Sequence, residues 1–149
     1  MRGARTLWLP WAVAFATVLA LLALPAFLAQ RAQPWYEAQI AVARFTLAIL
    51  ALVAAVGTFA LRESLVLRDV REGRLDPATP AGMARLRVRF LALWALCAAV
   101  GALGGVLAYG SGQPARGWPY LIGAAVLLVL HAPWAGFLRR VRVGDAGAS

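Results

Sequence analysis

The sequence has no lysine, one cysteine (Cys97), one histidine (His131) and six acidic residues among its 149. A single cysteine excludes a disulfide within the chain. A metal site needs about three or four ligands and a haem usually about two. Cys97 and His131 of one chain meet neither requirement, although a homodimer could pair His131 with the same residue of the second copy. The serines lie at edges or in tails, with no histidine in reach for a hydrolase site. We therefore predict no catalytic residue, no metal site, no cofactor and no enzyme activity.

Apolar residues, by contrast, are abundant, since the chain is 62% hydrophobic and 14% charged, with a mean hydropathy of +0.74. A water-soluble core in a chain of this length cannot absorb so much apolar surface. A helix that crosses a hydrocarbon layer of about 30 Å needs roughly 20 apolar residues, and four continuous runs rich in Ala and Leu meet this length. These predicted membrane helices cover residues 7–29, 39–61, 90–109 and 118–138.

The fifteen basic residues are all arginines, and most of them gather between the apolar runs. Two precede the first run, seven lie between the second and third, and three follow the fourth, whereas the two other loops hold only Arg31 and Arg116. Basic residues near helix ends stay in the cytoplasm. The sequence therefore predicts a multi-pass protein of the bacterial inner membrane, with both termini and the central segment inside. The net charge of +9 follows from this topology, and we expect no nucleic-acid partner.

The first run has one alternative interpretation, a cleaved signal peptide. Its apolar part is longer than the roughly 7–15 residues of a signal core, and residues 24–29 contain no clean small-x-small cleavage site. We therefore expect a retained helix, within a single transmembrane domain of residues 1–149.

The segment between the second and third runs is expected to extend both helices into the cytoplasm as a hairpin. The second helix should continue to about Gly73, a typical helix terminator, and Arg68 and Glu72 share one helix face. Thr79 fits an N-cap before Pro80, so the third helix should span residues 80–109. The exposed tip either binds a cytoplasmic partner or carries solvated charge that fixes topology and contacts anionic lipid. The predicted fold is an all-α integral membrane four-helix bundle.

The third run is rich in small residues, and Cys97, Gly101 and Gly105 recur every four positions. Small residues at this spacing let another helix backbone approach closely, which stabilises helix packing in membranes. We therefore predict a packing face made of these three residues. Its partner, the second helix of the same chain or another subunit, remains open.

Residues 95–108 read ALCAAVGALGGVLA. This stretch resembles the second helix of the proton-carrying c subunit of rotary ATP synthases. The ion-binding glutamate of that family falls on Ala98, so the resemblance does not imply ion binding. With residues 127–133, LLVLHAP, the chain is similar to small uncharacterised four-helix bacterial membrane proteins that have a c-like third helix. That resemblance implies a fold and no activity.

Arg44 and His131 fall inside the predicted spans, and Glu37 lies two residues before the second span. Charge inside a membrane is costly and often functional. Glu37 and Arg44 are seven residues apart, so they share one helix face. Either they form a pair, or Glu37 lies at the membrane–water interface and Arg44 separately extends its side chain to the headgroups. His131 precedes Pro133, which frees a backbone carbonyl. His131 either relays protons, hydrogen-bonds that freed carbonyl, or points to the inner headgroups. These residues carry the alternative function, a small oligomeric transporter or channel.

The favoured interpretation is a non-catalytic accessory, assembly or regulatory subunit that acts by helix packing. Its expected partners are the lipid bilayer and either another membrane protein or further copies of the chain.

Overall fold

The computed structural model describes residues 2–20, 26–27, 30, 35–76 and 79–133. Within these residues the chain is helical and contains no strand. Four main helices form a bundle: α1 (Arg2–Ala20), α3 (Glu37–Leu61), α5 (Pro80–Ser111) and α6 (Trp118–Leu130). The predicted all-α fold is therefore confirmed.

Helix α3 does not stop at its apolar end. It continues through a π-helical turn, Arg62–Leu67, into the short helix α4 (Arg68–Arg71). The three segments make one rod of 35 residues, Glu37–Arg71. The second predicted helix is thus extended beyond its apolar run.

The hairpin between this rod and α5 is shaped by two local signals. The rod is followed by Gly73, whose φ of 67° is a conformation that favours glycine. Helix α5 begins behind Thr79, whose hydroxyl accepts a hydrogen bond from the Gly82 amide at 3.0 Å. Pro80 occupies the first helical position, where its missing N–H costs nothing.

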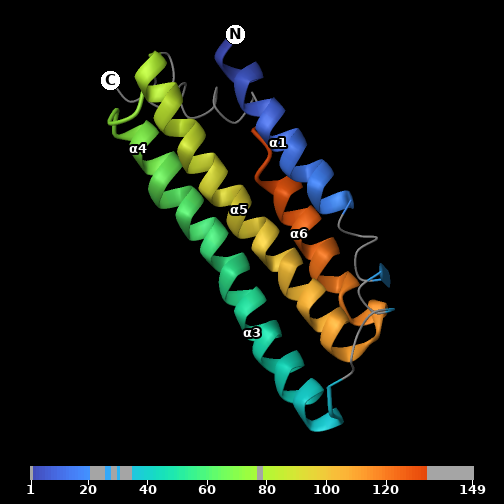
Figure 1. The fold of residues 1–149 in the computed structure, drawn as a ribbon. Coiled ribbons are helices and arrows are strands. Elements are labelled where there is room, and N and C mark those ends of the chain that lie inside the picture. The colour runs from blue at the N-terminus through green and yellow to red at the C-terminus, as the bar shows by residue number, and fades with distance from the viewer. Residues whose placement is uncertain (1, 21–25, 28–29, 31–34, 77–78, 134–149) are drawn as a thin grey trace.

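Helix α5 lies at the centre of the bundle (Figure 1). It packs against α3 on one side and against α6 and α1 on the other, and α1 also packs against α6. The start of α1 and the turn between α4 and α5 lie at the same end of the molecule (Figure 1). The connection from α5 to α6 and the start of α3 lie at the opposite end.

The core follows the face of α5 that is turned toward its neighbours. Buried residues recur there every three or four positions, as expected for one side of a helix. The core cluster contains Leu86, Phe90, Leu93, Trp94, Cys97 and Val100 of α5, Leu7 and Val18 of α1, and Ala124, Leu127 and Leu128 of α6. Cys97 has no exposed surface.

The fourth helix is shorter than predicted. Helix α6 ends at Leu130, and His131 and Ala132 form a turn before Pro133. Proline disfavours helical backbone at the residue before it, which explains the interruption. The prediction of an unbroken helix over 118–138 is therefore wrong at this end, and residues 134–138 lie outside the described part of the chain.

The other boundaries differ less. Helix α1 begins at Arg2 rather than at residue 7, and much of the predicted stretch 21–29 lies outside the described residues. Helix α3 starts two residues earlier than predicted, and α5 ends two residues later, at Ser111. Gly112 follows α5 with a φ of 63° and ends it.

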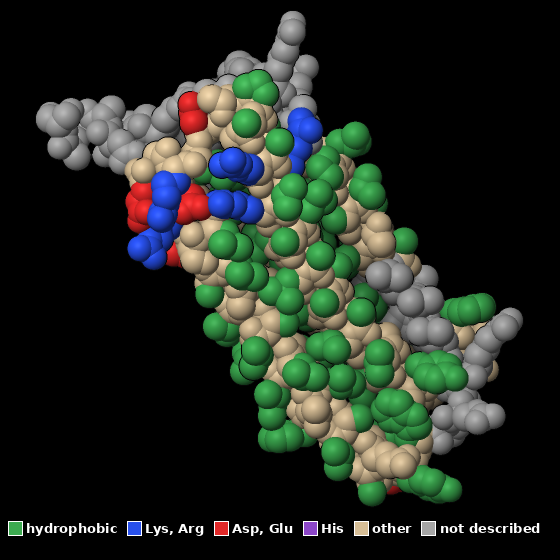
Figure 2. Space-filling view, turned by 60° about the vertical axis from the view of Figure 1, so that its left-hand side comes forward, with side chains coloured by type: hydrophobic (Ala, Val, Ile, Leu, Met, Phe, Trp, Pro, Cys, Tyr) green, Lys and Arg blue, Asp and Glu red, His purple; other side chains and the backbone are tan. Residues whose placement is uncertain are grey.

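Two of the described helices, the Glu37–Arg71 rod and α5, are long and apolar enough to cross a membrane. The apolar stretches Leu7–Ala20 and Pro114–Leu130 are shorter. Figure 2 shows Arg, Asp and Glu side chains gathered at the end that carries α4, above a face covered largely by hydrophobic side chains. Most charged side chains of the described residues therefore lie at one end of the bundle, and the exposed Glu37 and Arg44 on α3 are exceptions.

Candidate functional site

Helices α5 and α6 approach each other closely at glycines. A Cβ atom on Gly104 would lie 2.5 Å from the Gly117 carbonyl oxygen and 2.7 Å from Tyr120 Cβ. A Cβ atom on Gly101 would lie 3.1 Å from Leu121. Glycine at both positions therefore sets the distance between the two backbones.

This interface corrects the predicted packing face. Cys97 and Gly101 are buried, and Gly101 faces Leu121 and Ala124 of α6, but nothing within the described residues lies within 4 Å of a Cβ atom built on Gly105. A helix turns about 100° per residue, so positions four apart drift by about 40° and Gly105 rotates away from the face. Gly104 takes its place, and the partner is α6 of the same chain.

The C-terminal end of α6 is completed by side chains from three other helices. The last carbonyls of an α-helix have no partner within the helix. The Trp11 indole donates to the Leu128 carbonyl at 2.9 Å, and the Trp94 indole donates to the His131 carbonyl at 3.1 Å. Arg62 donates to the Leu130 carbonyl at 3.4 Å. We call Trp11, Arg62 and Trp94 the α6 cap.

His131 lies beneath this cap with no exposed surface. Its Nδ1 lies 2.7 Å from the Leu127 carbonyl oxygen, which only accepts, so Nδ1 carries the proton. The Phe59 ring packs on the imidazole at a centroid distance of 4.8 Å. The imidazole therefore bonds a backbone carbonyl, but that of Leu127 rather than the one that Pro133 leaves free, four residues before it.

Glu37 and Arg44 do not form a site in this structure. Both are exposed on α3, and no ion pair among the described residues includes either of them. Within the described residues there is also no group of three side chains suited to hold a metal ion.

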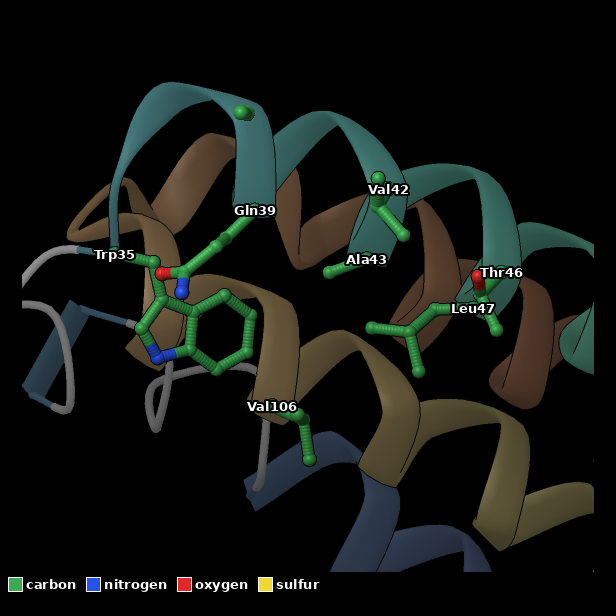
Figure 3. Close-up of a pocket in the computed structure, with 8 residues that line it drawn as sticks. Trp35, Gln39, Val42, Ala43, Thr46, Leu47 and Val106 are labelled. Carbon is green, nitrogen blue, oxygen red and sulfur yellow. The ribbon is translucent and has the colours of Figure 1, made fainter.

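A groove of about 710 Å³ lies between the first turns of α3 and the end of α5. Figure 3 shows its lining, which is apolar apart from Gln39 and Thr46. Trp35 anchors one end, since its backbone N–H donates to the Gly110 carbonyl at 2.8 Å and its ring packs on Gly110. The lining residues are Trp35, Ala38, Gln39, Val42, Ala43, Thr46, Leu47 and Val106. Sequence reasoning missed this groove, because two polar residues within an apolar run do not reveal which way they face.

The opposite end of the α3 and α5 pair is held by ion pairs. Asp69 is hydrogen-bonded to Arg89 at 2.5 Å and lies 3.1 Å from Arg74. Arg89 also donates to the Leu65 carbonyl in the π-helical turn. The Arg89 hydrogen bond lowers the pKa of Asp69 below its usual value, and the nearby arginine charges lower it further. This cluster ties the rod to the start of α5.

The predicted pair of Arg68 and Glu72 is present at 2.8 Å. Both side chains are well exposed, so this pair contributes little stability.

No family model, curated protein or solved structure matches the chain. The resemblance of residues 95–108 to an ATP synthase c subunit therefore stays a prediction.

Proposed function

We propose that this chain is a multi-pass protein of the bacterial inner membrane that acts as a non-catalytic accessory, assembly or regulatory subunit through helix packing. The observation that carries this proposal is the uncovered surface of α3. Val42, Phe45 and Leu52 of this helix are 68%, 71% and 66% exposed. Contiguous apolar surface on this scale is stable in a bilayer or against a partner, but not in water.

The distribution of charge supports the same proposal. Seven arginines lie between residues 62 and 89, at the end of the molecule that carries α4 and the start of α1. A positive-inside topology puts such an end in the cytoplasm. The hairpin tip then stands outside the bilayer, where a cytoplasmic domain of a partner subunit can reach it.

The alternative transport function gains no support from the site. A transporter of cations or protons needs a carboxylate held inside the membrane. Glu37 is exposed at the first turn of α3, and the other acidic residues of the described chain lie in the hairpin.

Membrane embedding is tested first, by washing native membranes with alkaline carbonate. We expect the chain to remain in the pellet, because its helices are held by the hydrocarbon layer. Release into the supernatant would exclude an integral membrane protein.

The role as a subunit is tested by affinity purification of the tagged chain from native membranes in mild detergent, followed by mass spectrometry. We expect one other protein in stoichiometric amount. An untagged strain and a Gly104→Leu variant, in which the α5–α6 contact cannot form, serve as controls. Recovery of the chain with no other protein would overturn the role as a subunit.

A further inference from the structure

Two arginines at the charged end of the bundle have no partner in the described chain. Seven arginines lie between residues 62 and 89. Five of them are bound: Arg68, Arg71, Arg74 and Arg89 form ion pairs with acidic residues of the hairpin, and Arg62 donates to the Leu130 carbonyl. Arg85 and Arg87 form neither an ion pair nor a hydrogen bond with any described residue. Their positive charge is therefore not neutralised within the described chain.

Arg85 and Arg87 lie on the two sides of an exposed stripe on α5. A helix turns about 100° per residue, so Arg85 lies about 60° to one side of Val88 and Arg87 about 100° to the other. Val88 is 66% exposed, Arg85 is exposed and Arg87 is half-buried. A ligand over Val88 is therefore within reach of both long side chains.

Arg87 is the more constrained of the two. Its Nε atom is shielded from solvent and has no hydrogen-bond partner. A charged group that has lost water without gaining an acceptor is costly, and it attracts an anion more strongly than a fully solvated charge does. Phosphate fits this need, because a guanidinium group binds phosphate oxygens through its terminal N–H groups in paired hydrogen bonds.

The surroundings of these arginines indicate which kind of phosphate they meet. On α5 the exposed stripe turns apolar at Val88 and continues through Leu91 and Ala95. On the neighbouring rod, Leu65 lies at the same level, since its carbonyl accepts from Arg89, and it is also exposed. Figure 2 shows the same transition from charged to hydrophobic side chains. A phospholipid joins a charged phosphate to apolar chains in the same order, whereas a soluble phosphate or an acidic peptide would leave the apolar stripe uncovered.

We propose that Arg85 and Arg87 bind the phosphate of an anionic phospholipid in the cytoplasmic leaflet, with its acyl chains along Val88 and Leu91. A zwitterionic headgroup would place a further positive charge beside the two arginines, so a headgroup with net negative charge is favoured. The proposal rests on the membrane embedding and the orientation proposed above. It does not depend on the role as a subunit, because the turn between α4 and α5 is not part of the site.

The test is thermal unfolding of the purified, delipidated chain in a neutral detergent, with phosphatidylglycerol or phosphatidylcholine of the same acyl chains added. A ligand that binds only the folded chain raises the unfolding temperature. We expect phosphatidylglycerol to raise it by at least about 4 °C more than phosphatidylcholine does. Native mass spectrometry of the same samples should show phosphatidylglycerol retained on the chain.

Two double variants of equal net charge locate the site. Arg85→Gln with Arg87→Gln should lose most of the phosphatidylglycerol shift, because the groups that bind the phosphate are removed. Arg68→Gln with Arg71→Gln removes the same charge from two exposed arginines that are already paired with Glu72 and Glu63, and it should keep the shift. Each variant is compared with its own unfolding temperature without lipid, so a general loss of stability does not affect the result. Equal losses in both double variants would mean that the response follows net charge, and would overturn the site.

The remaining outcomes separate this proposal from the earlier ones. If glycerol phosphate alone stabilises the chain as strongly as phosphatidylglycerol, the ligand is a soluble phosphate and not a lipid. If the chain resists carbonate but responds equally to both lipids, the lipid site fails and membrane embedding stands. An equal response together with loss of a co-purifying protein from the first double variant would assign the two arginines to a protein partner instead. If carbonate releases the chain, membrane embedding fails and the lipid site fails with it.

Discussion

Two adjacent glycines of α5 have opposite surroundings. A Cβ atom on Gly104 would meet the Gly117 carbonyl oxygen at 2.5 Å, whereas one on Gly105 would have no neighbour within 4 Å. Gly104→Ala should therefore destabilise the bundle by about 1–3 kcal/mol through overpacking. Gly105→Ala should change its stability by less than about 1 kcal/mol, and helix propensity favours the alanine. Thermal unfolding of both variants in detergent measures the difference. Equal losses would mean that α6 does not pack at Gly104.

The α6 cap allows a comparison between two tryptophans, the buried Trp94 and the exposed Trp118. Trp94→Phe keeps most of the buried ring but removes the donor to the His131 carbonyl. A buried carbonyl left without a partner costs about 1–3 kcal/mol. Trp118 is 47% exposed, so Trp118→Phe is a suitable control and should have little effect. Both variants are compared by their unfolding temperatures in detergent. If the two lower it equally, the indole bond of Trp94 does not hold α6.

Single residues were predictable where the signal is local. Gly73 and Thr79 end and begin helices through their own backbone and side-chain properties, so residue type was enough. Gly104 was missed because a regular spacing of four residues drifts around the helix, and only contact with α6 distinguishes Gly104 from Gly105. The α6 cap was also missed, because its donors lie far from α6 in the sequence and only the folded structure brings them together.

At the scale of the elements, the stability of the hairpin formed by α4 and α5 should fall in acid. The pKa of Asp69 is lowered in the folded chain, chiefly by its hydrogen bond from Arg89. Because the pKa of Asp69 is lower in the folded chain than its unfolded value of about 3.9, the charged carboxylate stabilises the fold at pH values above about 3.9. This contribution is lost as the pH falls through the pKa of the folded chain. Asp69→Asn should therefore reduce stability at pH 7 and make little difference at the lowest pH. Hydrogen exchange of residues 62–76 across this pH range tests the prediction. A deficit in Asp69→Asn that persists unchanged at the lowest pH would show that the charge is not responsible.

The helices themselves followed from the lengths of the apolar runs, but two of their features did not. Hydropathy alone extended the fourth helix through His131 and Pro133, because both lie beside apolar residues. The π-helical turn Arg62–Leu67 has no sequence signature that we identified. Its Leu65 carbonyl accepts a hydrogen bond from Arg89, a contact between residues 24 positions apart that local sequence does not reveal.

For the whole molecule, the sequence predicted the separation of charge from apolar surface but not the neighbours of each helix. Four apolar runs of similar composition pack in several arrangements, and local patterns do not choose between them. The central place of α5 depends on where its glycines and Trp94 meet side chains from distant parts of the chain. The uncovered side of α3 became visible only once the packing of that helix against α5 was known.

The α6 cap also bears on the order in which the chain assembles. Trp11, Arg62 and Trp94 all precede α6 in the sequence, so they leave the ribosome before it does. With the membrane embedding proposed above, donors for the last carbonyls of α6 are already present on three earlier helices when α6 is inserted. Among the described helices, α6 is therefore the one that completes the bundle, and a chain truncated before residue 118 would leave the α6 cap without the carbonyls that it binds.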